Sequence, residues 1–548
     1  MTRYLQDVAA IERRYPVPYS PARDARLRRL REGWRQRLGE LDFNALNFEG
    51  QIDYIALRNR IDYGIETLRL TDERAVQIAP LLPFADDIRL LQEQRFDRKR
   101  VDARVAATTL DRIAKQATEL THKLKQQAGK SGEPVNRRDV SAVVAMRAAE
   151  QVQKLREVLS DWNKFYDGYD PSYSWWSRKS FVDADSALKS YADAVKEHLV
   201  GIKPGDKPPI IGDPALATGL RADLAVEMIP YAPQELVAIG EQEFDWIEQQ
   251  LHAVAKKMGY GDDWKAALEY TKNLAPPPGE VPWVIYDIAN YSENFIANQH
   301  SITLAPLARE IWRLAMQTPE DQLVNPFFSG GEVTHLSYPT DSMTLDERLM
   351  SMRGNTPHFN FPTVQHELVP GHHLQQFMTD RFNSHRGLLN ETPFWTEGWA
   401  VYWEMQLWDR DFPRNDPDRI GMLFWRLHRA GRIVFSLNYQ LGKWSPQQAV
   451  DFLVNRVGHE RANAEAEVRR TTIDAPLYQA AYVTGALQLR ALYKELVDSG
   501  RMTATDFHDS ILLGGPMPIE LVRARLTHQS LTKDFHSQWR FYELLKRK

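Results

Sequence analysis

The chain of 548 residues contains no cysteine, and this absence excludes disulfide bonds, thiolate metal ligands and cysteine nucleophiles. It has no uninterrupted apolar run of about 18 residues, so we expect no membrane-spanning helix. Neither sign of charge is in excess, since 69 Lys and Arg against 73 Asp and Glu give a net charge of −4. That balance argues against a protein dedicated to nucleic acid. The remaining composition, 43% hydrophobic and 26% charged residues, is typical of a globular protein.

The N-terminus also lacks the apolar core of a signal peptide. Charged residues, among them Asp7 and Glu12, interrupt the segment Met1–Pro16. The sequence as written therefore predicts a cytoplasmic protein. A periplasmic or otherwise exported protein whose signal had been removed would show the same N-terminus, so that alternative stays open.

Strand-like alternation of apolar and polar residues is scarce, whereas helical periodicity dominates. Leu188–Leu199 carries apolar residues three and four apart, as on one face of an amphipathic helix. Pro233–Met258 begins with proline and acidic residues and ends before a glycine, as many helices do. The best strand candidate is Val333–Tyr338. We therefore expect a mainly α fold, a large multi-helical array with at most a short strand pair near residues 329–338.

Two segments rich in proline and glycine, Lys203–Pro214 and Ala275–Pro282, mark connections between helices. The first predicts an N-terminal helical region (residues 1–205) and a C-terminal helical region (residues 206–548) that carries the candidate site. The same segments could be loops within one merged domain, and composition does not decide between these alternatives.

The sequence most typical of a chemical site is H-E-L-V-P-G-H-H at residues 366–373. In the H-E-x-x-H zinc helix, two histidines one turn apart bind the metal and the glutamate acts as general base. Here the residue four positions after His366 is Pro370, so the usual spacing is absent.

Helix geometry leaves two candidates for the second histidine ligand. At about 100° per residue, His372 points roughly 120° away from His366, whereas His373 returns to within about 20°. Pro370 lacks an N–H and clashes with the preceding turn, so a straight helix is not expected. Gly371 allows a bulge that could bring His372 into place. The choice between His372 and His373 stays open on local geometry.

A third ligand is expected from the segment Glu391–Trp408, where Glu397 lies among aromatic residues. A carboxylate in so apolar a helix is costly to bury without a cation, and a metal ion is one such cation. Glu404 lies two turns further on and faces the same side, so it is a candidate to orient a ligand imidazole.

The motifs H-E-L-V-P-G-H-H-L-Q and T-E-G-W-A-V-Y-W-E together resemble the domain-of-unknown-function 885 family of bacterial proteins, and the resemblance covers most of the chain. That family is similar to helical zinc peptidases of the thimet oligopeptidase and carboxypeptidase Taq kind, which implies helices around a deep active-site cleft. The first histidine of the pair recurs in the family pattern, which favours His372. The related peptidases place a glutamate ligand about 25 residues after their second zinc histidine, and here 397 − 372 is 25, which favours Glu397.

The resemblance implies a zinc-dependent metallopeptidase that cleaves short peptides or peptide termini. His366, His372 and Glu397 would hold one zinc ion per chain, and the same ligands also accommodate other divalent metals. Glu367 would act as general base on a metal-activated water. By analogy with the related peptidases, Tyr482 would stabilise charge on the substrate carbonyl oxygen.

Tyr478 and Arg470 are alternatives for the role of Tyr482. Two other functions stay open. A zinc hydrolase of a non-peptide amide or ester would use the same residues, whereas a non-catalytic metal- or peptide-binding protein would share only the scaffold. Glu367 argues against the second, because a binding protein has no use for a base beside its first ligand. The expected partner is a peptide or a small amide, with no nucleic acid and no membrane span.

Overall fold

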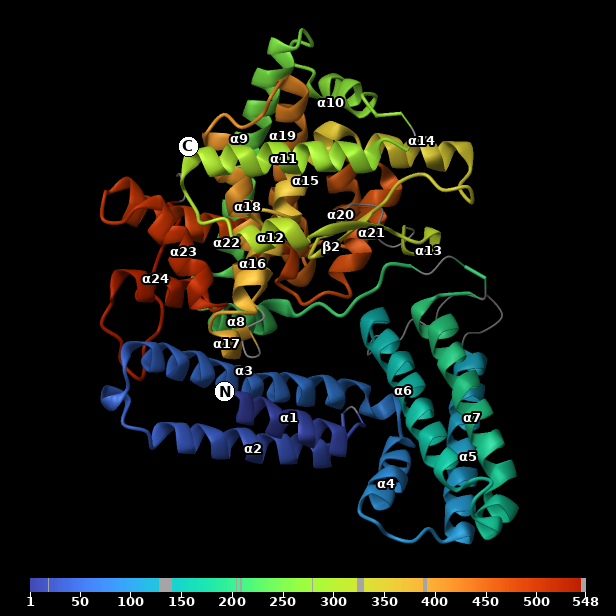
Figure 1. Cartoon of the computed structure of the whole chain (residues 1–548). Coiled ribbons are helices and arrows are strands. Elements are labelled where there is room, and N and C mark those ends of the chain that lie inside the picture. The colour runs from blue at the N-terminus through green and yellow to red at the C-terminus, as the bar shows by residue number, and fades with distance from the viewer. Residues whose placement is uncertain are drawn as a thin grey trace. The chain divides into compact units, whose positions relative to one another are not determined.

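Helices make up most of the protein in the computed structural model (Figure 1). The structure describes residues 1–17, 19–127, 140–203, 205–206, 209–277, 279–322, 330–387 and 392–543. Among these residues the only sheet has two strands, so the predicted mainly α fold is confirmed. The deep active-site cleft stays a prediction.

The chain forms two compact units. Unit 1 contains residues 1–2, 41–63 and 214–548, and unit 2 contains residues 3–40 and 64–213. The expected division at 205–206 lies near the one at 213–214, but residues 41–63 belong with the C-terminal part. Helix α3 (Phe48–Ile78) accounts for this, because one long helix contributes its first part to unit 1 and the rest to unit 2.

Every regular element in the described part of unit 2 is a helix. Besides the second part of α3, these are α1 (Thr2–Arg14), α2 (Pro21–Gly39), η2 (Ala79–Leu81), α4 (Ala85–Phe96), α5 (Ala103–Gln127), α6 (Ala142–Tyr166), α7 (Pro171–Val195) and η3 (Lys196–Val200). The helix predicted at Leu188–Leu199 corresponds to the end of α7 and to η3.

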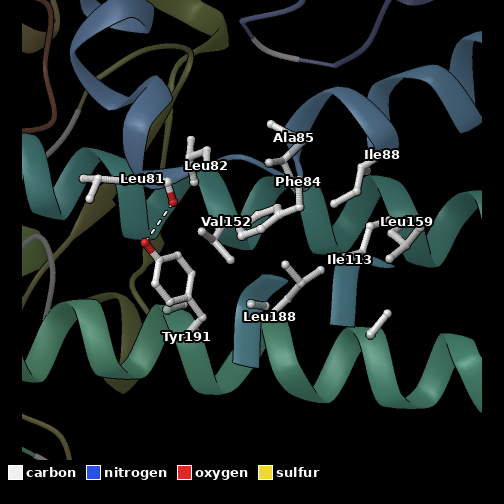
Figure 2. Close-up of a cluster of buried hydrophobic side chains, with 14 of the residues drawn as sticks. Leu81, Leu82, Phe84, Ala85, Ile88, Ile113, Val152, Leu159, Leu188 and Tyr191 are labelled. Atoms are coloured by element: carbon white, nitrogen blue, oxygen red, sulfur yellow. Dashed lines mark hydrogen bonds between the residues drawn. The ribbon is translucent and has the colours of Figure 1, made fainter. Parts of the chain in front are cut away.

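An apolar core joins α4, α5, α6 and α7. On α5 the buried residues Ala106, Leu110 and Ile113 recur every three or four positions, as in a helix with a single core face. They belong to one cluster with leucine, isoleucine and valine side chains of the neighbouring helices, and Figure 2 labels Ile113 among its members. The hydroxyl of Tyr191 donates to the carbonyl of Leu81 (2.8 Å), so the polar end of this buried ring also has a partner.

Unit 1 contains most of the remaining elements. In chain order they are η1 (Phe43–Ala45), α8 (Leu216–Val226), α9 (Pro233–Lys257), α10 (Trp264–Lys272), α11 (Val281–Gln299), α12 (Pro306–Ile311), β1 (Arg313–Met316), α13 (Pro319–Gln322), β2 (Val333–Leu336), α14 (Leu345–Gly354), α15 (Pro357–Glu367), α16 (His372–Thr379), α17 (Ser384–Gly387), α18 (Pro393–Asp409), α19 (Asp416–Gln440), α20 (Pro446–Phe452), η4 (Leu453–Val457), α21 (Arg461–Thr471), α22 (Tyr478–Tyr493), η5 (Lys494–Asp498), α23 (Ala504–Gly514) and α24 (Ile519–Thr527).

The short sheet differs in one respect from the prediction. Strand β2 lies within the predicted Val333–Tyr338, but its parallel partner β1 lies outside residues 329–338. Each strand has only four residues, too few for a period of two to be visible in the sequence. Ser329 lies outside the described residues.

Glycines allow the helices around the candidate site to approach closely. A Cβ atom on Gly398 of α18 would lie 2.7 Å from the backbone of Gly485 on α22, and a Cβ on Gly485 would lie 2.1 Å from the carbonyl of Phe394. Only glycine fits at such a contact. The pairing sets Glu397, the neighbour of Gly398, against the first turns of α22.

Candidate metal centre

The H-E-L-V-P-G-H-H motif forms a break between two helices. Helix α15 ends at Glu367, and α16 begins at His372 with Gly371 as its N-cap, while the Val369–Pro370 bond is cis. A Cβ on Gly371 would lie 1.9 Å from the carbonyl oxygen of His366, so no other residue fits there. The expected bulge in one helix is therefore two helix ends that meet, and His366 and His372 both lie at this junction.

His366, His372 and Glu397 come together in the interior of unit 1, with 3%, 8% and 7% of their surfaces exposed. Glu397 Oε2 lies 3.5 Å from His366 Nε2 and 3.2 Å from His372 Nε2. Two ligand atoms of a tetrahedral zinc ion lie about 3.3 Å apart, because each is about 2.0–2.1 Å from the metal. Each imidazole thus lies from Glu397 at about the distance that separates two ligands of one small cation.

Hydrogen bonds set the tautomer of His366. Its Nδ1–H donates to Glu404 Oε1 at 2.7 Å, which leaves a lone pair on Nε2. Arg429 in turn donates to Glu404 Oε1 at 2.7 Å and to Oε2 at 3.3 Å. The Arg429 guanidinium also lies 3.2 Å from Nδ1, but the carboxylate between them is the acceptor for both groups. Glu404 thus fixes the orientation of the His366 ring, and Arg429 holds Glu404.

A second chain of contacts orients His372. The side-chain amide of Gln375 donates to the carbonyl of Trp395 at 3.1 Å, which turns its oxygen towards His372. His372 Nδ1 lies 3.4 Å from that oxygen, so Nδ1 carries the proton and Nε2 faces Glu397. Both imidazoles therefore turn Nε2 to the same place, where each can offer a lone pair to a cation once Nε2 carries no proton.

The electrostatics of the site favour positive charge. Burial acts to raise the pKa of Glu397, but the adjacent His372 and His366 hold it well below its usual range, so the carboxylate is ionised. Burial acts to lower the pKa of His372, and the Glu397 carboxylate overrides this and raises it to about 9. A site that draws a proton onto a buried imidazole also attracts a metal cation.

Glu367 lies beside the two histidines and is less buried than they are. One potential ligand atom each of His366, Glu367 and His372 lies within 4.8 Å of the others. The backbone of Gly330, just before β2, lies against this carboxylate, because a Cβ on Gly330 would be 2.1 Å from Glu367 Oε2. Gly330 was not predicted as part of the site. The only signal for it in the sequence is the glycine pair before β2, which is compatible with a close approach of the backbone.

His373, the alternative second ligand, faces another part of unit 1. Its Nε2–H donates to the carbonyl of Ala308 on α12 at 2.6 Å, and the residue is 2% exposed. The helix that starts at His372 turns consecutive side chains about 100° apart. The structure therefore directs His372, and not His373, towards Glu397.

The two candidate tyrosines of α22 have different surroundings. The hydroxyl of Tyr478 donates to Glu397 Oε1 at 2.7 Å, so it steadies the carboxylate. Tyr482 lies parallel to the His366 ring with 6.3 Å between centroids, and its hydroxyl makes no hydrogen bond to a residue that the structure describes. The guanidinium of Arg432 lies 4.7 Å from its ring centre. The free hydroxyl beside the histidines is the one available to a ligand.

Arg470, the other alternative, is already paired. Its Nε donates to Asp474 at 2.9 Å, and its guanidinium lies 5.4 Å from the ring centre of Tyr478. It contacts the site through that ring.

Arg429 also contributes to the site and was not predicted from the sequence. It belongs to a series on α19, Arg426, Arg429 and Arg432, in which all three residues are buried. The argument applied to Glu397, that a buried charge needs a partner, applies equally to these arginines and was the signal that could have found Arg429.

Residues 7–526 match the model of a family described as bacterial protein of unknown function (DUF885). The chain belongs to this family. No curated protein matches it.

Two solved structures resemble this DUF885 member over nearly their whole length. A "putative lipoprotein of unknown function" from Shewanella oneidensis matches with a TM-score of 0.65 and 14% identity, over 96% of this chain and 98% of that chain. A "putative lipoprotein" from Colwellia psychrerythraea matches with a TM-score of 0.54 and 17% identity, over 93% and 91%. At these identities the likeness concerns the fold alone. Within the described residues, no helix is both long and apolar enough to span a membrane.

Proposed function

We propose that this DUF885 protein is a zinc-dependent hydrolase, and specifically a metallopeptidase that cleaves short peptides or peptide termini. The observation that carries the proposal is the approach of two imidazole Nε2 atoms to one carboxylate oxygen of Glu397, at 3.5 and 3.2 Å, inside the protein. A catalytic zinc site uses three such ligands and keeps a position for water.

The donor set fits a metal ion. Two neutral imidazoles with their Nδ1 atoms engaged, and one ionised carboxylate, are ligands that zinc and several other divalent metals accept. A bound zinc ion would polarise the scissile carbonyl and make a water molecule acidic enough to attack it near neutral pH. One ion per chain is expected.

The chain's own residues would move the protons. The carboxylate of Glu367 is only half-buried and would take a proton from the attacking water and pass it to the leaving amine nitrogen. The hydroxyl of Tyr482 would donate a hydrogen bond to the carbonyl oxygen as negative charge develops there. Tyr478 would keep Glu397 in place through the 2.7 Å hydrogen bond.

The peptide as substrate rests on the resemblance to helical zinc peptidases described above. An ester or another amide would be hydrolysed by the same residues, and a binding protein would hold the metal without turnover. On location, the descriptions of the two solved relatives as lipoproteins support the exported alternative over the cytoplasmic one.

The test combines metal analysis with hydrolysis. The protein is purified without added metal or chelator, its metal content is measured by mass spectrometry, and it is assayed against a peptide library and against simple esters. Wild type should hold about one zinc per chain. Glu367→Gln should keep the zinc and lose about 10²–10⁴-fold in kcat, whereas His366→Ala should lose the metal. Glu119→Gln, an exposed glutamate on α5, is the matched control.

Each contrary result points to one alternative. Unchanged turnover in Glu367→Gln would remove this residue from the mechanism. Hydrolysis of esters but not of peptides would select the non-peptide hydrolase. Bound zinc without any hydrolysis would favour the binding protein, and absence of zinc even after it is supplied would overturn the metal centre.

A further inference from the structure

One end of the helical bundle in unit 2 gathers residues from four helices. Here α4 and α6 end and α5 and α7 begin, at the lower end of the bundle in Figure 1. The Ser177 hydroxyl of α7 donates to the carbonyl of Ala103 on α5 at 3.1 Å, and the Arg95 guanidinium of α4 lies 4.5 Å from the Phe165 ring centre on α6. We call this surface the aromatic–basic end; it comprises Arg98, Lys99, Arg100, Arg104, Val105, Lys164, Phe165, Tyr169, Trp175, Trp176, Arg178, Lys179 and Val182.

Large apolar side chains on this surface face solvent. Trp175 is 84% exposed, Tyr169 83% and Phe165 56%. The same end of the bundle also holds aromatic residues that are packed, since the rings of Trp162 and Tyr173 meet at 5.4 Å and are almost wholly buried. The bundle therefore has its own aromatic core, and the exposed rings are additional to it. Several large exposed apolar groups at one end of a bundle indicate an interaction site.

The exposed face of α7 continues the apolar surface. Trp175 and Val182 are seven residues apart, so they lie on nearly the same side of the helix, with Lys179 between them. Val182 is 55% exposed, and Val105 at the start of α5 is 61% exposed. Other residues of α7, including Tyr173, form its buried face and pack in the core. The exposed apolar residues therefore have no role in the core.

Unpaired positive charge borders these rings. Arg98, Lys99 and Arg100 follow one another in the connection from α4 to α5, are exposed, and form no salt bridge with any residue in the described part of the chain. Of the neighbouring acids, Asp161 pairs with Arg95 and Asp167 with Arg178, each at 2.8 Å. Asp102 and Asp170 form no salt bridge with a described residue, but they are fewer than the unpaired basic residues of this surface. The charge left over is therefore positive.

A pocket of about 580 Å³ opens beside the turn between α6 and α7. Its lining residues are Lys164, Phe165, Tyr166, Tyr169 and Asp170. The lining is mostly aromatic, and its two charged residues, Lys164 and Asp170, are of opposite sign, so the pocket offers an apolar group a place beside a lysine.

We propose that the aromatic–basic end docks on the surface of an anionic lipid bilayer. Tryptophan and tyrosine rings are amphipathic and settle at the level of lipid headgroups, while lysine and arginine attract the anionic headgroups. Single-stranded nucleic acid also binds to surfaces with aromatic rings and positive charge, but its bases stack on the faces of those rings. The aliphatic Val105 and Val182 cannot stack, and they favour lipid. This surface acts without the metal centre, so the proposal does not rest on the proposed function.

The experiment uses the full chain and sedimentation with vesicles. Vesicles of phosphatidylcholine alone are compared with vesicles that also contain phosphatidylglycerol, at low and at physiological salt. Two variants remove the two kinds of contact: Tyr169→Ser/Trp175→Ser, and Arg98→Gln/Lys99→Gln/Arg100→Gln. Matched controls change exposed groups of the same kinds elsewhere: Tyr270→Ser/Trp283→Ser in unit 1, and Lys115→Gln/Lys123→Gln/Lys125→Gln along α5. Circular dichroism checks that each variant is folded.

Wild type should bind the anionic vesicles and not the zwitterionic ones, and added salt should weaken binding. The triple charge variant should bind about a hundredfold more weakly, at about fivefold for each basic residue. The aromatic variant should lose more than about tenfold and, with brominated lipid, much of the tryptophan quenching that wild type shows. Both controls should behave as wild type.

Three results would overturn the proposal. The first is a wild type that stays in solution with anionic vesicles at low salt. The second is an equal loss of binding in the controls and the variants, which would mean that general surface chemistry is responsible. The third is tighter binding to a single-stranded oligonucleotide that prevents vesicle binding and depends on the same residues.

Discussion

The cores of the two units are built on opposite principles. The cluster that joins α4 to α7 in unit 2 consists of apolar side chains, mostly alanine, leucine, isoleucine and valine, on one stripe of each helix. In unit 1, α18 and α19 are buried on nearly every side and carry Glu397, Glu404 and Arg429 into the interior. The first core is what the hydrophobic effect alone produces, whereas the second holds charges that it would exclude.

The difference matters because buried charges are a poor source of stability. Removing a carboxylate or a guanidinium from water costs several kcal/mol, and replacing a buried ion pair by apolar residues is often neutral or stabilising. The linked groups His366, Glu404 and Arg429 are therefore better explained by a ligand that they position than by the fold that they support. Unit 2 shows that the same chain can build a helical core without such groups.

The largest effect on stability is expected from Arg429→Met. Glu404 would lose the guanidinium 2.7 Å from its carboxylate, and breaking one side of a buried pair costs about 3–5 kcal/mol. The free energy of unfolding, measured by urea denaturation, should fall by that amount, and zinc content should fall with it. The double variant Glu404→Gln/Arg429→Met leaves no lone charge and should regain stability without regaining zinc. Full stability in the single variant would contradict the comparison.

A matched loss in unit 2 should leave the site untouched. Leu155 on α6 is fully buried in the apolar cluster, and Leu155→Ala should lower the free energy of unfolding by about 3 kcal/mol through the cavity it leaves. Zinc content and turnover of the folded protein should equal those of wild type. A fall in the zinc content of folded Leu155→Ala would show that the metal site in unit 1 depends on the core of unit 2.

The buried histidine His508 provides a test by pH. Burial lowers its pKa to about 3, and its ring bonds to the Tyr402 hydroxyl and the Ser301 carbonyl. An unfolded histidine has a pKa near 6.5, so below that pH the unfolded chain binds a proton that the folded chain does not, and stability falls as pH falls. From pH 6.5 to 5, wild type should lose about 2 kcal/mol relative to His508→Gln. His122→Gln, an exposed histidine of unit 2, should show no such difference in urea unfolding.

The smallest effect is expected from Tyr478→Phe, which removes one hydrogen bond to Glu397 and no charge. Loss of a partner that orients a ligand typically weakens metal binding, here by about tenfold. Competition with a zinc chelator measures this affinity. The control is Tyr493→Phe, which removes a hydrogen bond that Arg410 donates and that involves neither Glu397 nor the two candidate histidine ligands. Equal affinities of both variants would remove Tyr478 from the support of Glu397.

Much of the fold could be predicted from short-range patterns. Helix α9 starts at the expected Pro233, where the Glu235 carboxylate accepts from the Ala232 N–H at 2.7 Å, and β2 lies in the expected segment. Strand β1 was missed because its four residues carry almost no period and, unlike β2, follow no pair of glycines. For the site, the cost of burying a carboxylate predicted Glu397 from the aromatic residues beside it in the sequence, without knowledge of its neighbours in space. Gln375 and Gly330 act through contacts with residues distant in the sequence, which no local pattern reveals.

The sequence by itself determined the helical class and the chemical types available to the site, because periodicity and the cost of buried charge are properties of neighbouring residues. Local helix geometry left open whether His372 or His373 faces Glu397, because the direction of the chain after Pro370 is not fixed by its neighbours in the sequence. The tertiary structure turns His372 towards Glu397, through the helix break at Gly371 and the Ala308 carbonyl that accepts from His373. The packing of α15, α18 and α22 sets the distances between site residues that lie 25 or more positions apart in the sequence. Only that packing brings the side chains of His366, His372 and Tyr478 to the Glu397 carboxylate.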